Sequence, residues 1–426
     1  MTPDIKYSLP RYTRGPCVWT LEGMPPYAHM AALTPALLRE IEPGTLNSAV
    51  VAEADMEAAM VAVKSGGYVV VMGDEPIVHR CDFSEGMATG EIFPLVSAAN
   101  KAKTACVVRL GGFGDMLQTA AVLPGLKAQG FHVTVMTKPG GKAIIEHDPH
   151  VDEWYLLDTD QVPNHELPDF FGVVGKQFER FVNLCESVEG TFLAMPGRVS
   201  HTWPDKVRHK LMNRNYHEFA ADLAGVVAEP CRLFYPTEEE KAKARGLANP
   251  DEFTVLWALA GSSTHKFSPW QDAVVARIML DMPEARVIYT GDEWCKILEC
   301  GWEDEPRVSC LSGEIGIRES LALAQMVDCV VGPETGVLNA VAFERDVSKV
   351  IMLSHSSEHN LTKHWVKTQT LAPKDCACFP CHRLHYGNEF CQTDEETGAA
   401  MCAKKIPATD IYDAIHKVYA NWKKRR

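Results

Sequence analysis

Short runs of β-branched residues alternate with helical segments in two separate stretches of this chain. The first stretch begins at Thr104. A strand-like run over residues 105–108 is followed there by a helical pattern over 116–128 and a second strand-like run over 133–136. This order is typical of βαβ units, whose helices cover the faces of a parallel sheet. The first stretch therefore predicts a parallel α/β domain.

The second stretch follows the charged segment 238–243 and the break at Asn249-Pro250. Its strand-like runs cover residues 253–257, 286–289, 329–331 and 350–353, and its helical patterns lie near 270–280 and 317–326. We predict an α/β fold with two Rossmann-like doubly wound domains in tandem and a boundary near residue 240.

Residues 1–103 are different from the rest of the chain. They contain one strand-like run over 68–72 and one helix-like stretch over 56–63, and no recognisable chemistry. We interpret this segment as a small N-terminal extension of unknown role.

Composition limits the class of protein. With 46% hydrophobic and 23% charged residues the chain is globular, and its 426 residues are enough for two or three domains. A net charge of −14 disfavours non-specific binding to nucleic acid or anionic lipid. No segment has the about 18 to 20 unbroken apolar residues of a membrane span, and the first residues lack the apolar stretch of a signal peptide. We expect a cytoplasmic protein.

Three loops that follow predicted strands carry the candidate chemistry, because ligands of doubly wound sheets bind beyond the carboxyl ends of the strands. The first loop contains Arg109, Gly111, Gly112, Gly114 and Asp115. Its glycines allow a ligand to approach the backbone closely, and a helix N-terminus follows. The glycine spacing is not that of a dinucleotide site, which disfavours a dinucleotide-dependent oxidoreductase. Asp115 is either the N-cap of the helix or a general base.

The second loop follows the strand at 253–257 and is suited to a diphosphate, because it combines hydroxyl groups with one lysine ahead of a helix. The candidate donor-binding residues are Ser262, Ser263, Thr264 and Lys266. The alternative is a polar loop in which Ser268 is the N-cap and Pro269 the first residue of the helix, and this role can coexist with binding.

The third loop follows the strand at 329–331 and contains Glu334, Thr335, Gly336 and Asn339. A carboxylate and a hydroxyl at a strand-to-helix turn are suited to sugar hydroxyls. The backbone N–H groups of Thr335 and Gly336 are suited to a phosphate.

In this order the three loops resemble glycosyltransferase family nine, the lipopolysaccharide heptosyltransferases. The family's first signature is an R-x-x-x-x-G-D run that continues to a leucine, a proline and a leucine. Here these are residues 109–115, followed by Leu123, Pro124 and Leu126. Residues 147–153 resemble the family's N-P-x-V-D segment, and residues 311–324 resemble the stretch that precedes its D-T-G. The resemblance covers about residues 104 to 420.

The resemblance implies a GT-B fold, with the acceptor bound by the N-terminal domain and the donor by the C-terminal domain. Asp115 matches the catalytic base, Lys266 the donor-phosphate lysine, and Thr335-Gly336 the turn at the donor phosphate. The implied reaction is inverting and independent of metal. A carboxylate takes the proton of the acceptor hydroxyl, while a lysine and helix N-termini stabilise the departing nucleoside diphosphate. The implied partners are a nucleoside-diphosphate sugar, with an ADP-sugar as first candidate, and a saccharide acceptor in lipopolysaccharide or other envelope glycan synthesis.

Two positions depart from the family pattern. The D-T-G is Glu334-Thr335-Gly336, and the usual histidine three residues later is Asn339. These changes indicate a different sugar or lost activity. Two alternatives therefore stay open: the same chemistry on a nucleic-acid base or a protein, and a non-catalytic scaffold that binds a nucleotide sugar.

Five of the fourteen cysteines lie close together near the end of the sequence, at 376, 378, 381, 391 and 402. A C-x-x-C pair with two later cysteines has the spacing of a structural zinc site, with Cys378, Cys381, Cys391 and Cys402 as ligands. A redox-labile disulfide and unlinked thiols are the alternatives, and we expect a structural role in each case. The family also has a cysteine-bearing loop here, with the ending that Cys402 to Ile406 shows. The other nine cysteines occur singly, as expected of buried residues in a reducing compartment.

The predicted organisation has four parts. They are the extension 1–103, an acceptor domain over 104–240, a donor domain over 241–406 with the cysteine-rich loop 376–402, and a C-terminal helix over 407–426. This helix has apolar residues at helical spacing. The GT-B resemblance implies that it returns to the N-terminal domain.

Overall fold

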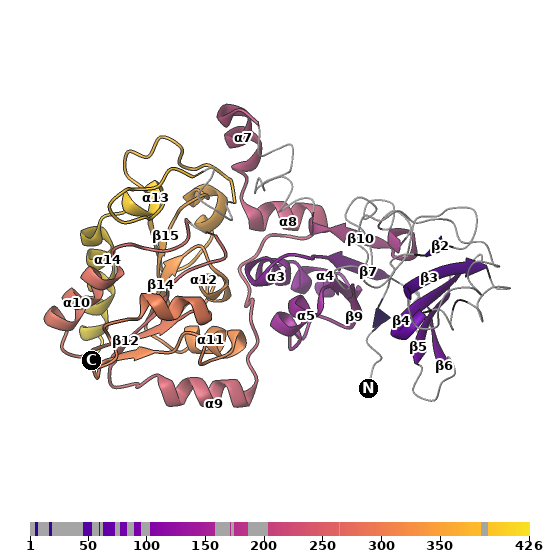
Figure 1. Cartoon of the computed structure of the whole chain (residues 1–426), viewed down its shortest axis with the longest axis horizontal. Helices are drawn as coiled ribbons and strands as arrows, with labels where there is room; N and C mark the ends of the chain where they lie inside the picture. Colours follow the sequence, from indigo (N-terminus) through magenta and orange to yellow (C-terminus); the bar gives the residue numbers. More distant parts are fainter. Residues whose placement is uncertain are drawn as a thin grey trace. The chain divides into compact units, whose positions relative to one another are not determined.

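The computed structural model describes residues 5–6, 17–18, 46–52, 59, 63–72, 77–82, 89–94, 103–157, 171, 174–185, 203–263, 265–384 and 391–426. The chain forms two compact units (Figure 1). Unit 1 consists of Met1–Leu110, Leu126–Ala143 and His150–Val182, and unit 2 of Gly111–Gly125, Ile144–Pro149 and Asn183–Arg426.

A five-stranded sheet with the order β1-β9-β8-β7-β10 forms the centre of unit 1. Its strands are β1 (Ile5–Lys6), β7 (Thr104–Val108), β8 (His132–Thr137), β9 (Glu153–Leu156) and β10 (Arg180–Asn183). The pairs β1/β9, β9/β8 and β8/β7 are parallel. Every residue of β7 is buried, as a central parallel strand covered on both faces requires. Helices α4 (Leu123–Ala128) and α5 (Pro139–Ile145) follow β7 and β8 in the chain, as the sequence predicts for βαβ units.

A second sheet of unit 1 has the order β2-β3-β4-β5-β6 and lies within the N-terminal extension. Its strands are β2 (Cys17–Val18), β3 (Leu46–Ala52), β4 (Val63–Met72), β5 (Ile77–Asp82) and β6 (Thr89–Pro94). Only β3 and β4 pair in parallel. The predicted strand at 68–72 is confirmed within β4. The helix-like stretch at 56–63 lies outside the described residues, except for the helical Ala59 and for Val63, which begins β4.

The sheet of unit 2 has six strands, all paired in parallel, in the order β13-β12-β11-β14-β15-β16. They are β11 (Phe253–Ala258), β12 (Ala285–Thr290), β13 (Val308–Cys310), β14 (Cys329–Pro333), β15 (Ser348–Met352) and β16 (Thr368–Leu371). The chain runs outward from β11 to β13 and then returns to the other side of β11 with β14. The strand order therefore reverses between β11 and β14, as in a doubly wound Rossmann sheet.

Unit 2 also contains helices. They are α3 (Phe113–Ala120), α7 (Asp205–Met212), α8 (Tyr216–Ala224), α9 (Glu238–Leu247), α10 (Gln271–Asp281), α11 (Ile317–Ala324), α12 (Gly336–Ala340), α13 (Met401–Lys404) and α14 (Ala408–Lys423), with the 3₁₀ helix η7 (Glu293–Leu298) and the π-helix η8 (Glu358–Thr362). In the described part of the chain, no helix combines the length and the apolar character needed to span a bilayer.

The predicted helix at 116–128 is two helices. α3 ends at Ala120, and α4 begins at Leu123 with Pro124 as its second residue. Proline lacks the N–H group that a continuous helix needs and is tolerated in a first turn, so the chain restarts its helix there. The charged segment 238–243, for which we predicted no secondary structure, forms the first turns of α9. Thr237 caps this helix and shares a capping box with Glu240.

α14 covers the sheet of unit 2. Alternate β11 residues Phe253, Val255 and Trp257 share one hydrophobic cluster with the apolar side chains of α10 and α14. The ring centroids of Phe253 and Tyr419 are 5.3 Å apart. Burying a large apolar side chain contributes about 1.5 to 3 kcal/mol. The expectation that the last helix returns to the N-terminal domain is wrong, because its apolar face packs in the hydrophobic cluster of β11 and α10.

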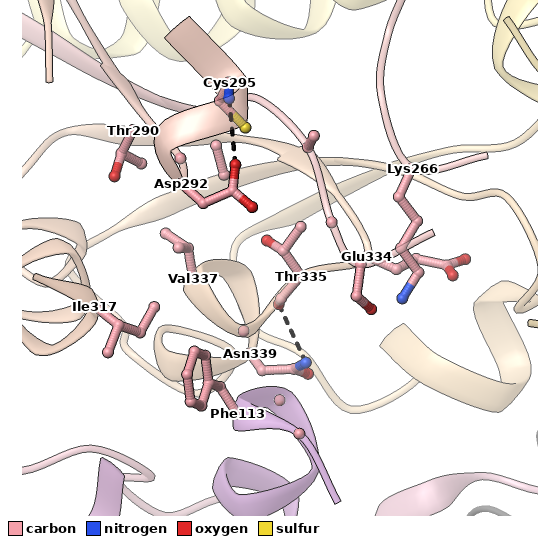
Figure 2. A pocket seen from close by; sticks show the side chains of 18 of the residues that line it. Phe113, Lys266, Thr290, Asp292, Cys295, Ile317, Glu334, Thr335, Val337 and Asn339 are labelled. Carbon is pink, nitrogen blue, oxygen red and sulfur yellow. Dashed lines mark hydrogen bonds between the residues drawn. The ribbon is translucent and has the colours of Figure 1, made fainter. Parts of the chain in front are cut away.

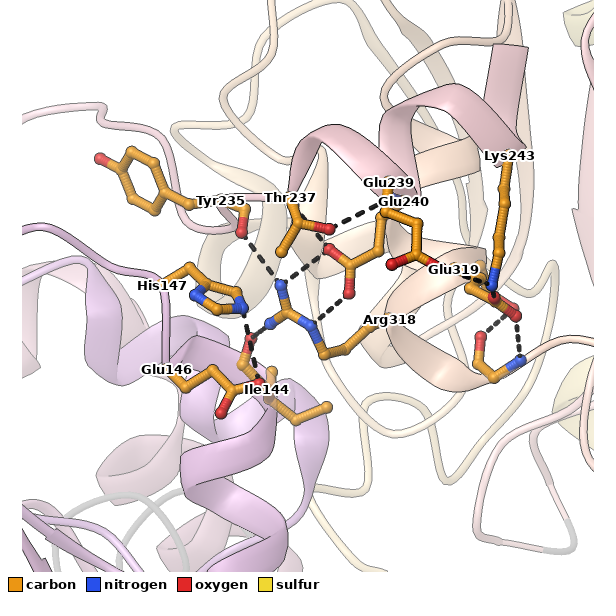
Figure 3. A network of polar contacts seen from close by, with 12 residues as sticks. Ile144, Glu146, His147, Tyr235, Thr237, Glu239, Glu240, Lys243, Arg318 and Glu319 are labelled. Carbon is orange, nitrogen blue, oxygen red and sulfur yellow. Dashed lines mark hydrogen bonds and ion pairs between the residues drawn. The ribbon is translucent and has the colours of Figure 1, made fainter. Parts of the chain in front are cut away.

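Arg318 of α11 ties together three segments that are distant in the sequence (Figure 3). Its guanidinium donates to the carbonyl oxygens of Ile144 and Tyr235 at 2.7 and 3.1 Å. It also donates to both carboxylate oxygens of Glu240, at 2.6 and 2.9 Å. Burial acts to raise the pKa of Glu240, but Arg318 and the Thr237 cap outweigh burial and lower it. The bidentate pair keeps the start of α9 attached to α11.

Candidate active site

A cavity of about 800 Å³ lies in unit 2 at the carboxyl ends of β11 and β14. These two strands flank the point at which the strand order reverses, which is where doubly wound sheets bind ligands. The lining residues come from α3, from the loops after β11, β12, β14 and β15, and from η7 and α11. Figure 2 shows Lys266 and Glu334 at one end of the cavity and Thr290 at the other.

The N-terminus of α3 forms one wall of the cavity, which we call the α3 wall (residues 111–115). Asp115 lines the cavity and is partly exposed. Its Oδ2 accepts the backbone N–H of Gly112 at 2.8 Å. Gly112 is the N-cap and Asp115 the third residue of the helix, so the prediction that Asp115 is the N-cap is wrong. Its capping hydrogen bond reaches back from N3.

Glycine is required at two positions of this wall. A Cβ on Gly111 would lie 2.4 Å from Asp115 Oδ2, and a Cβ on Gly114 would lie 2.9 Å from Asn339 Nδ2. The nearest atom to a Cβ on Gly112 would be 3.6 Å away. Gly111 therefore makes room for the Asp115 carboxylate, and Gly114 lets α3 approach α12. Gly112 and Gly114 line the cavity.

Lys266 reaches the cavity from the loop after β11. The loop is folded back on itself, because the Gly261 N–H donates to the Lys266 carbonyl and the Lys266 N–H to the Ser263 carbonyl, both at 2.9 Å. Burial lowers the pKa of Lys266, against the attraction of Glu334 and Asp115. A buried ammonium of this kind gains strongly from a bound anion such as a phosphate.

The other predicted residues of this loop have different positions. Ser262 lines the cavity. Ser263 is buried, with Oγ 3.2 Å from His265 Nδ1. Thr264 lies outside the described residues. The prediction that Ser268 is the N-cap and Pro269 the first helical residue is wrong. α10 begins two residues later, and its N-cap Trp270 donates its N–H to Ser268 Oγ at 3.3 Å.

Glu334 lies at the end of β14 and is buried. Its Oε1 accepts the backbone N–H groups of Ser354 and Ser356 at 2.9 and 3.0 Å. Its Oε2 contacts Nδ1 of His355 and accepts the Ser354 hydroxyl at 3.3 Å. Burial acts to raise the pKa of Glu334, but His355, Lys266 and the Ser354 N–H outweigh it and hold the pKa at about 2. The carboxylate is therefore ionised and held in place.

His355 also lines the cavity, and it was not predicted from the sequence. Its Nδ1 lies 3.2 Å from His265 Nε2, and the two rings are edge to face. Burial lowers its pKa, against the attraction of Glu334. We call Glu334, Ser354, His355 and Ser356 the β14–β15 wall.

The turn between β14 and α12 brings the remaining predicted donor residues to the same cavity. Thr335 is the N-cap of α12 and Gly336 its first residue. Both line the cavity, as does Asn339, whose side-chain amide donates to the Thr335 carbonyl at 3.2 Å. Within the described part of the chain, the buried Thr335 hydroxyl has no hydrogen-bond partner. It is therefore available to a ligand oxygen.

The far end of the cavity is mainly apolar, with Ile315 and Ile317 near α11 and Trp294 and Ile297 on η7. Asp292 stands at the start of η7, where its Oδ1 accepts the N–H of Trp294 at 3.1 Å. A polar end that carries Lys266, joined to an apolar end, matches a ligand that has an anionic part and a flat apolar part.

The fold is shared with solved glycosyltransferase structures. The chain aligns with Escherichia coli ADP-heptose lipopolysaccharide heptosyltransferase II at 12% identity and a TM-score of 0.50, over 75% of this chain and 99% of that one. It aligns with a family 9 glycosyltransferase from Veillonella parvula at 13% identity and a TM-score of 0.53, over 75% and 98%. No protein-family profile matches the sequence, and no curated protein sequence matches it.

This chain has the GT-B fold of the family 9 glycosyltransferases. The predicted fold class is confirmed, with two parallel Rossmann-like sheets and an N-terminal extension. The part aligned with these GT-B structures is about three quarters of the chain.

Arg109 and Gly111 are the predicted residues of the first loop that do not line the cavity. The side chain of Arg109 is buried at the end of β7, and its N–H donates to the Met136 carbonyl at 3.0 Å. Arg109 belongs to unit 1, whereas the lining residues belong to unit 2.

None of the five cysteines lines the cavity, although Leu384 of the same loop does. Cys376 and Cys378 have their sulfur atoms 3.7 Å apart, and all five cysteines of the loop are free thiols. No group of three or more metal-binding side chains occurs in the ranges that the structure describes, so a zinc site is not supported.

Of the singly occurring cysteines, Cys106, Cys295 and Cys329 are buried as expected, whereas Cys300 is exposed because it follows the short helix η7 at the surface.

Proposed function

We propose that this protein is an inverting, metal-independent glycosyltransferase that moves a sugar from a nucleoside-diphosphate sugar to an acceptor hydroxyl. The observation that supports it most is the meeting of Asp115, Lys266 and the Thr335-Gly336 turn around one cavity in a chain with the GT-B fold. The resemblance assigns these same residues to the catalytic base, the phosphate lysine and the phosphate turn.

The proposed chemistry needs a base on one side of the anomeric carbon and positive charge on the other. The acceptor oxygen attacks the anomeric carbon, and its proton passes to the Asp115 carboxylate. The bond from the anomeric carbon to the diphosphate oxygen breaks, and its electron pair stays on the departing diphosphate. Lys266 stabilises that charge, as preorganised cations do for developing negative charge. Attack opposite the leaving group inverts the anomeric centre.

We propose an ADP-sugar as the first donor to test. The structural neighbour from Escherichia coli is described as an ADP-heptose transferase. The apolar end of the cavity near Ile315 and Ile317 suits a nucleobase, and the Lys266 end suits the diphosphate. The sugar itself is not assigned, because Glu334 replaces the family's aspartate and Asn339 replaces its histidine. A saccharide acceptor and a cytoplasmic location belong to the same proposal, on the sequence grounds given above.

The test is a thermal-shift screen of the full chain with ADP-, UDP-, GDP- and CDP-glucose, because a ligand that binds only the folded state raises the melting temperature. We expect one nucleotide class to stabilise the protein and Lys266→Ala to abolish the shift. Lys417→Ala, at an exposed position of α14, is the matched control and should keep it.

The same screen separates the candidate functions. Stabilisation followed by slow hydrolysis of the bound nucleotide sugar supports a transferase and justifies an acceptor search. Binding without turnover against saccharide, protein and nucleic-acid acceptors favours the scaffold. No response to any of the four nucleotide sugars contradicts the proposed function.

A further inference from the structure

The carboxylate of Glu334 is fully engaged by the protein itself. Each oxygen has two partners, namely the N–H groups of Ser354 and Ser356 on Oε1 and the His355 ring and Ser354 hydroxyl on Oε2. A carboxylate offers about four acceptor positions. The residue in the place of the family's aspartate is therefore not presented to a sugar hydroxyl.

The group that this arrangement presents to the cavity is the imidazole of His355. Its polar contacts, to Glu334, His265 and Ser354, are all made through Nδ1. His355 is 5% exposed, and it lines the cavity beside Lys266 and Thr335. Nε2 is then the ring atom that a ligand meets. A carboxylate on Nδ1 fixes the ring and favours its protonated form.

Charged groups reach His355 from every element around it. Glu334 comes from the end of β14, Asp115 from α3, and Lys266 with His265 from the loop after β11. His382, from the loop after β16, donates its N–H to the His355 carbonyl at 2.9 Å. The surroundings of His355 thus contain two carboxylates, of Glu334 and Asp115, and one ammonium, of Lys266. A diphosphate adds further negative charge, which an imidazolium would balance.

We propose that His355 contacts the diphosphate of the bound donor through Nε2 and takes up a proton as that donor binds, with Glu334 as the residue that positions its ring. This inference rests on the proposed function, because it takes the ligand to be a nucleoside-diphosphate sugar. The inference makes His355 the second positive group of the site, beside Lys266. The position at which the family has a histidine is Asn339 in this sequence.

The direction of the proton transfer follows from the surroundings. In the unliganded protein burial lowers the pKa of His355, so the ring is neutral near pH 7. An anion at Nε2 raises the pKa, and the complex takes a proton from the solvent. The diphosphate of a nucleotide sugar is esterified at both ends and is fully ionised at this pH, so it does not titrate itself.

The experiment is isothermal titration calorimetry of the full chain at pH 7 to 7.5, with whichever of ADP-, UDP-, GDP- or CDP-glucose binds. The titration is repeated in buffers with different enthalpies of ionisation. The slope of binding enthalpy against buffer enthalpy gives the protons taken up, and we expect an uptake of up to about one proton per nucleotide sugar. We expect His355→Asn to lose this uptake and to bind about 10-fold more weakly. His416→Asn, exposed on α14, should match the wild type.

Glu334 is tested as a positioning residue in the same assay. We expect Glu334→Gln to reduce the proton uptake, because the carboxylate that favours the imidazolium is gone. Glu334→Asp, which keeps the charge, should recover part of it. A purely structural role would lower the melting temperature of both variants and leave the uptake unchanged.

The outcomes distinguish the two proposals. Binding by the wild type with no dependence on the buffer overturns this inference and leaves the proposed function standing, and this measurement needs no variant to fold. Full proton uptake by a folded His355→Asn also overturns it. If none of the four nucleotide sugars binds, the proposed function and this inference fail together.

Discussion

Asp115 and Glu334 line the same cavity, but the two walls that carry them are built in different ways. On the α3 wall, Asp115 is partly exposed and makes one capping hydrogen bond, at a place where Gly111 provides the space. On the β14–β15 wall, Glu334 is buried and has four partners. A partly exposed carboxylate at a cavity can accept a proton from a substrate, whereas one with four partners holds its neighbours in place. We therefore propose proton transfer for Asp115 and a structural role for Glu334.

The largest effect should come from Asp115→Asn. The amide oxygen still accepts the Gly112 N–H, so α3 and its stability are kept, but the base is lost. We expect kcat for sugar transfer to fall by about 10² to 10⁴, the usual contribution of a general base. The check is turnover of the donor identified by thermal shift, with the melting temperature as control. A variant that keeps more than a tenth of wild-type turnover would contradict the role given to the α3 wall.

The next effect should come from Gly111→Ala, paired with Gly112→Ala. A methyl group on Gly111 would meet the Asp115 carboxylate at 2.4 Å and displace it, whereas one on Gly112 meets nothing closer than 3.6 Å. A displacement of about 1 Å can cost about 100-fold in rate. We expect Gly111→Ala to lose about 10- to 100-fold in kcat and Gly112→Ala to lose much less. Equal losses in the two variants would mean that the place of the carboxylate is not set by this glycine.

The free energy of unfolding should respond in the opposite order, with the larger loss on the β14–β15 wall. Glu334→Gln keeps one oxygen for the Ser354 and Ser356 N–H groups, but it puts an uncharged amide N–H₂ against the His355 ring and the Ser354 hydroxyl, where the contact of the carboxylate is lost. We expect a loss of about 1 to 3 kcal/mol in the free energy of unfolding. Asp115→Asn should cost only a few tenths of a kcal/mol. Urea denaturation of both variants makes the comparison, and equal losses would show that the walls do not differ in this way.

The smallest effect concerns the loop behind the β14–β15 wall. Burial lowers the pKa of His382 to about 3, and across the described residues neither of its ring nitrogens has a hydrogen-bond partner. In the unfolded chain histidine titrates near its ordinary pKa of about 6.5. The unfolded state therefore binds more protons below this pH, and stability falls as the pH drops from about 6.5 towards 3.

His382→Asn should weaken that dependence by at most about 1.4 kcal/mol per pH unit. Asparagine suits the position because residue 382 has a φ of 51°, in the left-handed region that asparagine tolerates. The measurement is urea denaturation between pH 4.5 and 7.5. Identical slopes for the two proteins would show that folding does not lower the pKa of His382.

Much of the fold was predictable because buried parallel strands leave apolar runs. β7, β11 and β14 are buried throughout and were found from the sequence. β16 is half-buried along its length and reads Thr-Gln-Thr-Leu, so it gives no such run. α9 was missed because we assigned no secondary structure to its charged residues, although the pair of Thr237 and Glu240 is a capping-box signal.

The cavity was predictable in outline and not in its chemistry. Loops that follow strands identify Asp115, Lys266 and Thr335, because the topology gathers the ends of parallel strands at one edge. His355 follows β15 in a Ser-His-Ser run that matches no motif. Its pairing with Glu334 joins residues that are far apart in the sequence, and only the packing of β14 against β15 reveals it.

The Arg318 network also bears on how such chains can be recombined. A chimera could join the C-terminal part of this chain to the N-terminal part of a related chain. It would be cut near residue 240, where the sequence suggests the boundary. That cut removes Tyr235 and leaves Glu240 at the junction, so the guanidinium loses a carbonyl partner and a fixed carboxylate. It also replaces the segment that carries the Ile144 carbonyl. A viable exchange keeps residues 235–240 together with the C-terminal part of this chain. The N-terminal part taken from the other chain must end its counterpart of α5 at the same place.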